Sequence, residues 1–306
     1  YDSDYADTNT VSVNTSDTMW GGHVSAINKY HDNLSVYVRL SRGFKAGGVN
    51  GESLSRIGEE GLEQFTLELR ERESFEPETL NNIEMGIRAS NDDNSLTASA
   101  NIFYSSRDNM QVKQWIHNEL AVQQDGAAPK FVGYISNAPE GTNYGLETRV
   151  RYRPNQDVTL SAGVSLLESE VKNMFRLETD PDTYEKSRVS IGGRTQAHAP
   201  RYQYFVSGQW HLTDRISTSL SATGKDGYYY SFSHDSKSSA VNLVNASLTY
   251  RGDNLDITLW SRNMTDEDYG VRGFNFGNDP RDDYASKTYE QLGEPMVYGV
   301  KLDFVF

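Results

Sequence analysis

The last nine residues of the chain, Tyr298–Phe306, alternate between apolar and polar or small side chains and end on a phenylalanine. On an extended strand the apolar residues share one face, with Val305 the only break in the alternation. Termini of soluble proteins usually fray, whereas a closed membrane barrel has to pair its last strand with its first. The terminus therefore favours a membrane barrel, and the last strand of a soluble β-sandwich is the alternative.

The composition narrows the class of protein. The chain has 306 residues, with 19 Tyr and 12 Phe against 8 Pro, which suits long strands and aromatic girdles. A mean hydropathy of −0.67 and the absence of a long apolar run exclude a transmembrane helix but not a barrel, whose strands are only half apolar. The net charge of −14 argues against nucleic acid as a partner. Without cysteine, the chain has no disulfide and no thiolate metal site.

Short and long connections alternate along the chain. The short ones are rich in Asp, Asn, Gly or Pro, as tight turns are, and lie at 31–33, 91–94, 153–157, 212–215 and 251–254. Long polar stretches lie between them, near 47–75, 117–130, 172–199, 230–239 and 270–294. This asymmetry is typical of outer-membrane barrels, which have short periplasmic turns and long extracellular loops.

Period-two patterns flank the short turns and predict eleven strands from about residue 18 to the end. The stretches 95–116 and 255–269 can supply the ~9–11 residues that a membrane strand needs. We predict an all-β fold: an antiparallel, up-and-down transmembrane β-barrel, present in part as one curved sheet that is open because its partner strands are missing. The odd strand count, together with the absence of an initiator Met and of a signal peptide, predicts that this is a piece of a longer protein.

The same patterns assign the two faces of the strands. Charged residues at mid-strand are predicted to point into the lumen: Arg39, Glu84, Arg88, Glu147, Arg149 and Asp303. The apolar face is predicted to meet lipid through Val36, Val38, Ile87, Ala100, Leu160, Val164, Leu220, Leu248, Leu259, Leu302 and Phe304. An Arg or Lys that faced lipid at mid-bilayer would cost ~2–4 kcal/mol. In a soluble sandwich the charged face would be the outer surface. The alternating pattern alone does not distinguish a membrane barrel from a soluble sandwich.

A set of motifs in a fixed order resembles a known family. These are Tyr37–Asn50, Phe75–Gly86, Asn137–Glu147, Arg262–Tyr269 and the terminal strand. They resemble motifs of the TonB-dependent outer-membrane receptors. In the same order, the family patterns are Y-x-x-x-S-R-G-[FY]-K-x-G-G-x-N, F-x-P-E-x-x-x-x-x-E-x-G, N-x-x-x-x-x-x-x-G-x-E, x-N-L-x-D-x-x-Y and the closing strand of the barrel. Met264 stands where Leu is usual. The resemblance runs from about residue 37 to 306 and is closest to the iron-siderophore branch.

The resemblance implies a barrel of about 22 strands, of which residues 1–306 form about 11 C-terminal strands, with the N-terminal plug domain and first strands outside the chain. It implies a receptor in the cell outer membrane of a Gram-negative bacterium, surrounded by lipid. Uptake of a scarce small molecule would draw energy from the TonB complex through the missing N-terminal region, and the barrel-assembly machinery would recognise the C-terminal strand. A ferric siderophore is the expected ligand. A vitamin or an oligosaccharide, a passive porin-like or surface-binding barrel, and a soluble carbohydrate-active β-protein remain alternatives.

The candidate ligand contacts lie at a strand-to-loop boundary and in the last long connection: Tyr228, Tyr229, Tyr230, His234, Arg272 and Phe274. Aromatic rings there could form an interfacial girdle or stack on a planar ligand, and an arginine can pair with an anionic chelate. Basic residues such as Arg194, Arg201, Arg272 and Arg281 would offset the acidic composition locally.

Other residues are given supporting roles. Gly43, Gly47 and Gly48 are expected to let a strand bend at the rim. Glu84 and Glu147 would either hold a plug across the lumen or belong to a solvated face. Asn263 and Asp266 are expected to shape a turn, and Asp180–Asp182 and Asp279–Asp283 to be solvated loop charge.

The sequence gives no support for catalysis. It has no nucleophile elbow, phosphate loop or zinc-binding helix. The six His lack metal-ligand spacing, so neither a resident metal nor another cofactor is expected.

Overall fold

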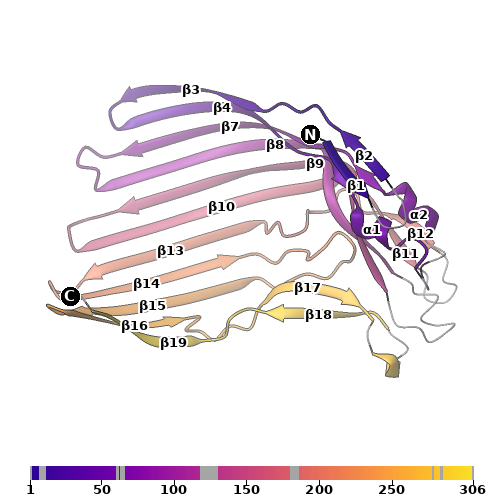
Figure 1. The fold of residues 1–306 in the computed structure, drawn as a ribbon. Coiled ribbons are helices and arrows are strands. Elements are labelled where there is room, and N and C mark those ends of the chain that lie inside the picture. The colour runs from indigo at the N-terminus through magenta and orange to yellow at the C-terminus, as the bar shows by residue number, and fades with distance from the viewer. Residues whose placement is uncertain are drawn as a thin grey trace.

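Residues 2–6, 12–59, 62, 66–117, 130–179, 186–277, 279–282 and 285–304 are described by a computed structural model. They form one antiparallel sheet of eleven strands, in which neighbours along the sheet follow the order of the chain (Figure 1). The strands are β3 (Gly22–His31), β4 (Leu34–Lys45), β7 (Glu78–Ser90), β8 (Leu96–His117), β9 (Phe131–Tyr152), β10 (Val158–Lys172), β13 (Tyr202–His211), β14 (Ile216–Lys225), β15 (Val241–Arg251), β16 (Leu255–Arg262) and β19 (Val297–Phe304).

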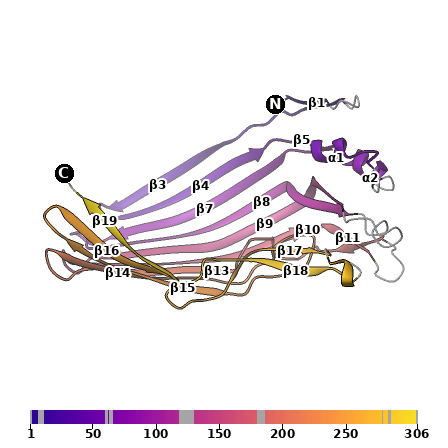
Figure 2. The same cartoon turned by 60° about the horizontal axis from the view of Figure 1, so that its bottom comes forward.

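The sheet is curved and open. Figure 2 shows it as a trough whose two sides end in β3 and β19, and within the described residues neither of these strands has a partner on its outer side. The predicted strand number, the up-and-down order and the open sheet are all confirmed. No helix in the described ranges has the length and apolarity that crossing a membrane requires.

The two rims of the sheet differ as predicted. The short turns gather at the left-hand end of Figure 1, and they follow β3, β7, β9, β13 and β15. At the other end, the connections carry small elements: β5 (Gly48–Val49), α1 (Gly51–Ser55), α2 (Thr66–Glu71), β6 (Ser74–Phe75), β11 (Phe175–Thr179), β12 (Lys186–Ser190), β17 (Gly270–Phe276), the 3-10 helix Pro280–Asp282 and β18 (Lys287–Leu292). Upstream of the sheet, β1 (Asp2–Ala6) pairs with β2 (Ser12–Ser16).

Buried apolar side chains collect at the long-connection end. There β8 and β9, each 22 residues long, extend beyond their neighbours. One buried cluster consists of Leu62, Leu69, Ile116, Val132 and Tyr134. A second consists of Met110, Val112, Ala138, Val171, Met174 and Ile191. The connections before β7 and after β10 thus pack on the upper part of the β8–β9 hairpin, because only there can they remove apolar surface from water.

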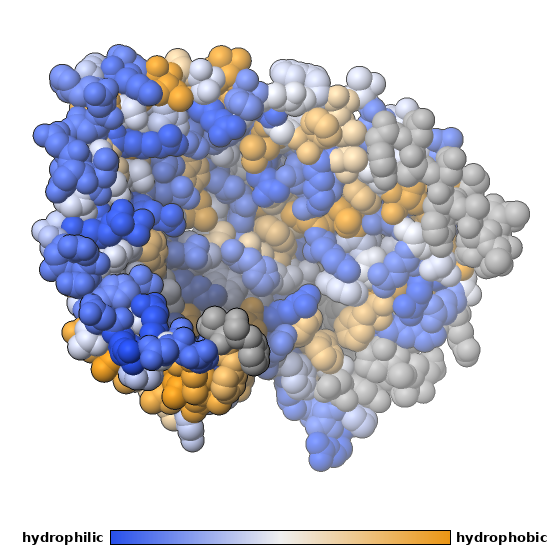
Figure 3. All heavy atoms as spheres, turned by 60° about the vertical axis from the view of Figure 1, so that its left-hand side comes forward, coloured by the Kyte–Doolittle hydropathy of each residue, from blue (hydrophilic) through white to orange (hydrophobic). Residues whose placement is uncertain are grey.

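The register of the strands separates the two predicted sets of residues. One row of consecutive partners is Val36, Ile87, Ala100, Thr148 and Val164, and another is Arg39, Glu84, Phe103 and Gly145. Successive side chains of a strand point to opposite faces, and the two rows are three positions apart, so they lie on opposite sides of the sheet. Leu220, Leu259 and Leu302 are 47%, 50% and 53% exposed, so no described residue covers their face. The rim of short turns, which comes forward in Figure 3, is mostly hydrophilic, and apolar residues gather in patches beside it.

Two local expectations are corrected. β16 ends at Arg262 instead of continuing to residue 269, because Asn263 has a φ of 48° and leaves the strand. The amide of Asn263 donates to the carbonyl of Glu267 and accepts from its N–H, which confirms the predicted turn. Gly43 does not bend β4: it pairs regularly with Leu80, and a Cβ there would meet nothing within 4 Å.

Close backbone approach occurs instead at Gly47, where a Cβ would lie 2.6 Å from the carbonyl oxygen of Phe75. The loop charges at Asp180–Asp182, Asp283, the connection 118–129 and the final residues Val305 and Phe306 lie outside the described residues.

Candidate ligand-binding rim

Tyr228 and Tyr230 lie in the connection after β14 and are 6% and 4% exposed. Their rings meet edge to face at 5.8 Å. The hydroxyl of Tyr228 donates to the carbonyl of Val271 at 3.1 Å, and that of Tyr230 donates to the Glu290 carboxylate at 2.9 Å. Burial, followed by the bond to Glu290, raises the pKa of Tyr230. The two side chains therefore fasten this connection to the β17–β18 hairpin, and their contact with a ligand stays a prediction.

Tyr229 lies between these two residues and has a different environment. The guanidinium of Arg194 lies 3.8 Å from the centre of its ring, and the ammonium of Lys237 lies 4.0 Å from it. The side chain of Arg194 is only 8% exposed and pairs with Asp235 at 3.0 Å. It also donates to the carbonyl of His234 at 2.7 Å. The tyrosine is thus held by cation–π contacts between two long connections.

The charge that the described residues place around Tyr229 is mainly positive. Arg176 pairs with Asp235 at 2.7 Å and has a further interaction, so within the described part of the chain three cations, Arg176, Arg194 and Lys237, lie around one carboxylate. The hydrogen bond from Arg176 is the main cause that lowers the pKa of Asp235. Burial lowers the pKa of Arg194, and Asp235 partly offsets this effect. An anion is therefore the ligand that this cluster favours electrostatically.

His234 and His198 flank the cluster. Burial lowers the pKa of His234, and the nearby Arg194 adds to the effect. Burial is also the main cause that lowers the pKa of His198, whose ring lies 5.3 Å from that of Tyr228. Both imidazoles are therefore held toward the neutral form.

Arg272 and Phe274 lie on β17, two residues apart and both exposed. The guanidinium of Arg272 lies 5.1 Å from the centre of the Phe274 ring. Tyr228 donates a hydrogen bond to Val271 on the same strand, and Tyr230 donates one to Glu290 on the neighbouring β18. The structure thus brings all six predicted ligand residues onto two connections that contact each other. Whether they bind a ligand stays a prediction.

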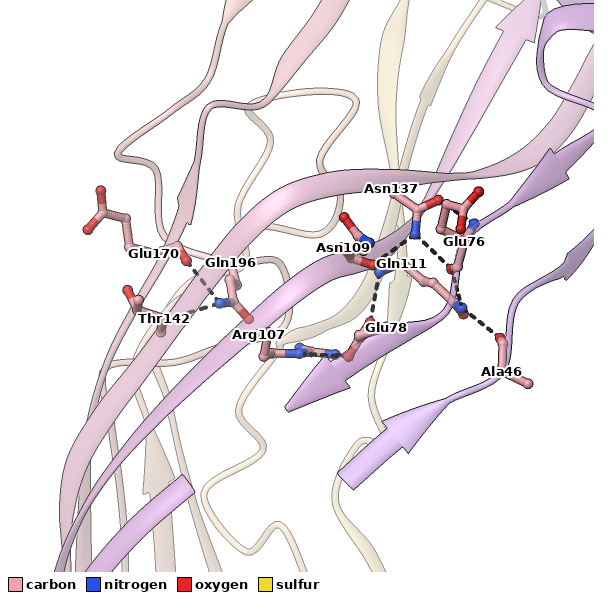
Figure 4. A network of polar contacts seen from close by, with 10 residues as sticks. All are labelled: Ala46, Glu76, Glu78, Arg107, Asn109, Gln111, Asn137, Thr142, Glu170 and Gln196. Carbon is pink, nitrogen blue, oxygen red and sulfur yellow. Dashed lines mark hydrogen bonds and ion pairs between the residues drawn. The ribbon is translucent and has the colours of Figure 1, made fainter. Parts of the chain in front are cut away.

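A second polar network anchors the connection before β7 (Figure 4). The Asn137 side chain accepts from the N–H of Glu76 at 2.8 Å and donates to its carbonyl at 2.9 Å. Gln111 donates to the carbonyl of Ala46 at 2.7 Å. Glu78, 5% exposed, accepts from the N–H of Gln111 at 2.7 Å and forms an ion pair with Arg107. Two stretches that the sequence singled out, at Phe75–Glu78 and Asn137, therefore meet in space.

The charged face of the sheet is held by contacts between neighbouring strands. The hydroxyl of Tyr37 donates to Glu84, and the Arg88 guanidinium lies 5.0 Å from the Tyr37 ring. On the next strands the Asn101 amide donates to Glu147 at 3.3 Å. Glu84 and Glu147 thus have partners within the sheet, and a bond from either to a plug stays a prediction.

The charged face of the sheet also carries Arg149 and a shallow hollow. The guanidinium of Arg149 lies 5.4 Å from the ring of Phe205. A shallow hollow of about 400 Å³ opens over β14 to β16, lined mainly by Ser219, Ser221, Ser247, Trp260 and Arg262. Hydroxyls, an indole and the guanidinium of Arg262 line this part of the face, so its lining includes a positive charge.

A family model described as TonB dependent receptor-like, beta-barrel, matches residues 1–264. The chain belongs to this family. The resemblance inferred from the ordered motifs is thereby confirmed. We expect the apolar face, with Val36 and Ala100, to meet lipid in the receptor barrel, because a charge at mid-bilayer is costly. The opposite face, with Arg39 and Glu84, is then expected to line the lumen, and this assignment stays a prediction.

Solved receptors share the fold of the chain. The ferric yersiniabactin uptake receptor FyuA from Yersinia pestis has a TM-score of 0.66 at 18% identity. The siderophore receptor PiuA from Acinetobacter baumannii has a TM-score of 0.66 at 18% identity, and the copper transporter OprC has 0.66 at 13%. The matches cover 95%, 97% and 97% of this chain, which spans 38%, 37% and 41% of those proteins. At such identities the likeness concerns the fold alone.

Several residues that build the receptor rim were missed by sequence reasoning. Asp235, Arg176 and Glu290 have no distinctive spacing, because their partners come from other connections. Glu78 falls inside the recognised motif, but its partner Arg107 lies 29 residues away. The local signal available for it was a conspicuous Pro-Glu pair at the start of a strand.

Proposed function

We propose that the full-length protein is an outer-membrane receptor that takes up a ferric siderophore with energy from the TonB complex. Membership of the family supports uptake, and two of the solved proteins with the same fold are described as receptors for siderophores or their ferric complexes. The observation that carries the proposal is the positive cluster around Tyr229 at the rim of a chain whose net charge is −14.

The rim has the chemistry that an anionic, partly planar iron chelate would need. Arg272 is exposed and carries a planar fork of donors that can pair with chelate oxygens. Phe274 beside it offers aromatic surface to a planar group, and Tyr229 holds the cations Arg194 and Lys237 in place through its ring. Tyr228 and Tyr230 fix the position of the β17–β18 hairpin, which carries Arg272 and Phe274, through hydrogen bonds to Val271 and Glu290.

The remaining parts of the proposal concern the whole receptor. A plug would occupy the lumen against the charged face, and a segment before this chain would contact the TonB complex. Outer-membrane lipid would surround the apolar face, and the assembly machinery would recognise the terminal strand. Iron would enter with the chelate as cargo, so the receptor would need no resident cofactor.

Uptake by the full-length receptor tests the ligand contacts. With Tyr229→Ala or Arg272→Ala, we expect the concentration of ferric siderophore for half-maximal uptake to rise about fivefold or more, as loss of ~1 kcal/mol of cation–π or ion-pair energy implies. The double variant should be weaker than either single one. Arg281→Ala is the matched control, because Arg281 lies in the same connection but is 88% exposed and paired with Asp279. Normal uptake by the double variant, at normal surface levels, would remove both residues from the site.

The choice of ligand is tested separately. Iron limitation should induce the gene, and a panel of ferric siderophores, a vitamin, copper and an oligosaccharide should show uptake of a ferric siderophore only. Uptake of any other member of the panel in its place would contradict the proposed ligand while leaving the receptor fold intact.

A further inference from the structure

The lipid-side face of β4, β7 and β8 changes character between two rows of partners. The last apolar row consists of Leu40, Ile83 and Tyr104. The next row toward the long connections consists of Arg42, Asn81 and Ser106. In a membrane barrel, the height at which apolar side chains give way to polar ones is the height of the lipid headgroups.

A groove of about 630 Å³ crosses this boundary. Its floor is apolar, its sides carry two aromatic rings and its upper end is polar; the main lining residues are Trp20, Val24, Leu40, Arg42, Ile83 and Tyr104. Gly22 also lines it, and a Cβ at Gly22 would meet no atom within 4 Å. The missing side chain of Gly22 therefore leaves the groove open.

Arg42 supplies a positive charge at the polar end. Its guanidinium donates to the side-chain oxygen of Asn81 at 2.9 Å and lies 4.7 Å from the centre of a Trp20 ring. Its Nε is buried and has no hydrogen-bond partner in the described part of the chain. No carboxylate among the described residues forms an ion pair with it, although acidic residues outnumber basic ones by 43 to 29. The charge is therefore available to an anion from outside.

We propose that this groove binds a phosphorylated glycolipid of the outer leaflet, with an acyl chain along Val24, Leu40 and Ile83 and a phosphate at Arg42. A guanidinium fork matches phosphate in charge and geometry. Trp20 and Tyr104 lie where amphipathic rings face headgroups. The groove opens on the face opposite Arg39 and Glu84, so it is separate from the lumen and from the proposed uptake site.

An upstream strand next to β3 is the competing occupant. Neighbouring strands lie about 4.8 Å apart, so side chains of such a strand would reach Val24 on β3 first. The Arg42–Asn81 pair lies on β4 and β7, one and two strands further in. The polar end of the groove therefore stays open to the membrane even beside a paired β3.

Lipid retained by the full-length receptor, purified from outer membranes in mild detergent, tests the site by mass spectrometry. Arg42→Gln removes the charge, and Gly22→Leu fills the groove beside its cross-strand partner Arg42 while the cation itself is kept. Each should retain about fivefold less phosphorylated glycolipid than the wild type, since one cation near headgroups is worth about this factor. Arg201→Gln is the matched control: Arg201 is 62% exposed, already faces Glu168 and should leave retention unchanged. Gel mobility without heating checks that each variant is folded.

Two further measurements keep the outcome decisive. Wild-type receptor stripped of lipid should rebind the phosphorylated glycolipid about fivefold better than its dephosphorylated form, and equal rebinding would overturn the proposal. In receptor stripped of lipid, Gly22→Cys should react with a maleimide, because no bound lipid then covers the groove, and residues 1–306 contain no cysteine that would compete. Protection of that cysteine in the stripped receptor would show an upstream strand in the groove and would also overturn the proposal.

Discussion

At the scale of single residues, Glu78 is a buried carboxylate whose removal should be costly. It is almost fully buried and accepts from Arg107 and from the N–H of Gln111. We expect Glu78→Ala to lower the free energy of unfolding of the full-length receptor by ~2 kcal/mol, because it leaves a buried donor and a cation unpaired. This expected loss of unfolding free energy is smaller than the loss for a fully buried ion pair, because the Arg107 side chain is 27% exposed.

Glu140→Ala is the control for this prediction. Glu140 pairs with Lys172 in a half-exposed position, so its loss should cost less than about 1 kcal/mol. Denaturant unfolding in detergent measures both variants. Equal destabilisation by the two would mean that burial of Glu78 contributes nothing.

Glycines inside the strands show what single residues could not reveal in the sequence. Gly86 lies opposite Tyr37, Gly145 opposite Phe103 and Gly163 opposite Phe205. A Cβ on Gly86 would lie 2.4 Å from the Tyr37 ring, so the aromatic ring occupies the space that the glycine leaves. Such pairs require the register between two strands, which an alternating pattern within one strand does not contain.

At the scale of the elements, the connection 226–240 should respond to pH. Burial keeps the pKa of His198 and His234 below the ordinary 6.5, so both favour the neutral form when folded. Their contribution to stability is full above pH 6.5 and is lost as the pH falls below it, because the unfolded segment binds protons more readily. Protonated His234 would face Arg194 and Arg176 beside Asp235, and protonated His198 would face Arg272 and Lys225.

Hydrogen exchange measures this loosening. After correction for intrinsic rates, protection of 226–240 should be lower at pH 5.5 than at pH 7.5, while the short turn 212–215 should be unaffected. In the double variant His198→Phe, His234→Gln the pH dependence should flatten. The same dependence in that variant would assign the effect to other groups.

Strands and short turns could be predicted because their signals are local. The alternation of apolar and polar residues predicted all eleven strands of the sheet, and the turn-forming residues predicted each short turn. The arrangement of the long connections could not, because it rests on pairs such as Arg194 with Asp235, which are distant in sequence and come from different loops. The early end of β16 at Arg262 was missed because one left-handed residue, Asn263, ends a pattern that otherwise continues.

At the scale of the whole molecule, the assignment of faces is sharp enough to test with two adjacent residues. Ala100 is in the apolar row with Ile87, and Ser99 is in the row with Arg88 and Arg149. Ala100→Arg would place a charge in lipid at a cost of ~2–4 kcal/mol, whereas Ser99→Arg would place the same charge in the lumen at nearly the same height. The amount of folded receptor in outer membranes should fall for Ala100→Arg only. The reverse result would exchange the two faces.

The length of the β8–β9 hairpin has a consequence for what the cell shows to its surroundings. Each strand has 22 residues, and at ~3.3 Å per residue spans ~70 Å, more than twice the ~30 Å of bilayer hydrocarbon. In the proposed orientation, the hairpin would lift α1 and α2, which lie beside its upper part, well above the membrane surface even when it is tilted. The connection that carries these helices would be open to an antibody or a phage, while the short turns would be shielded by the membrane.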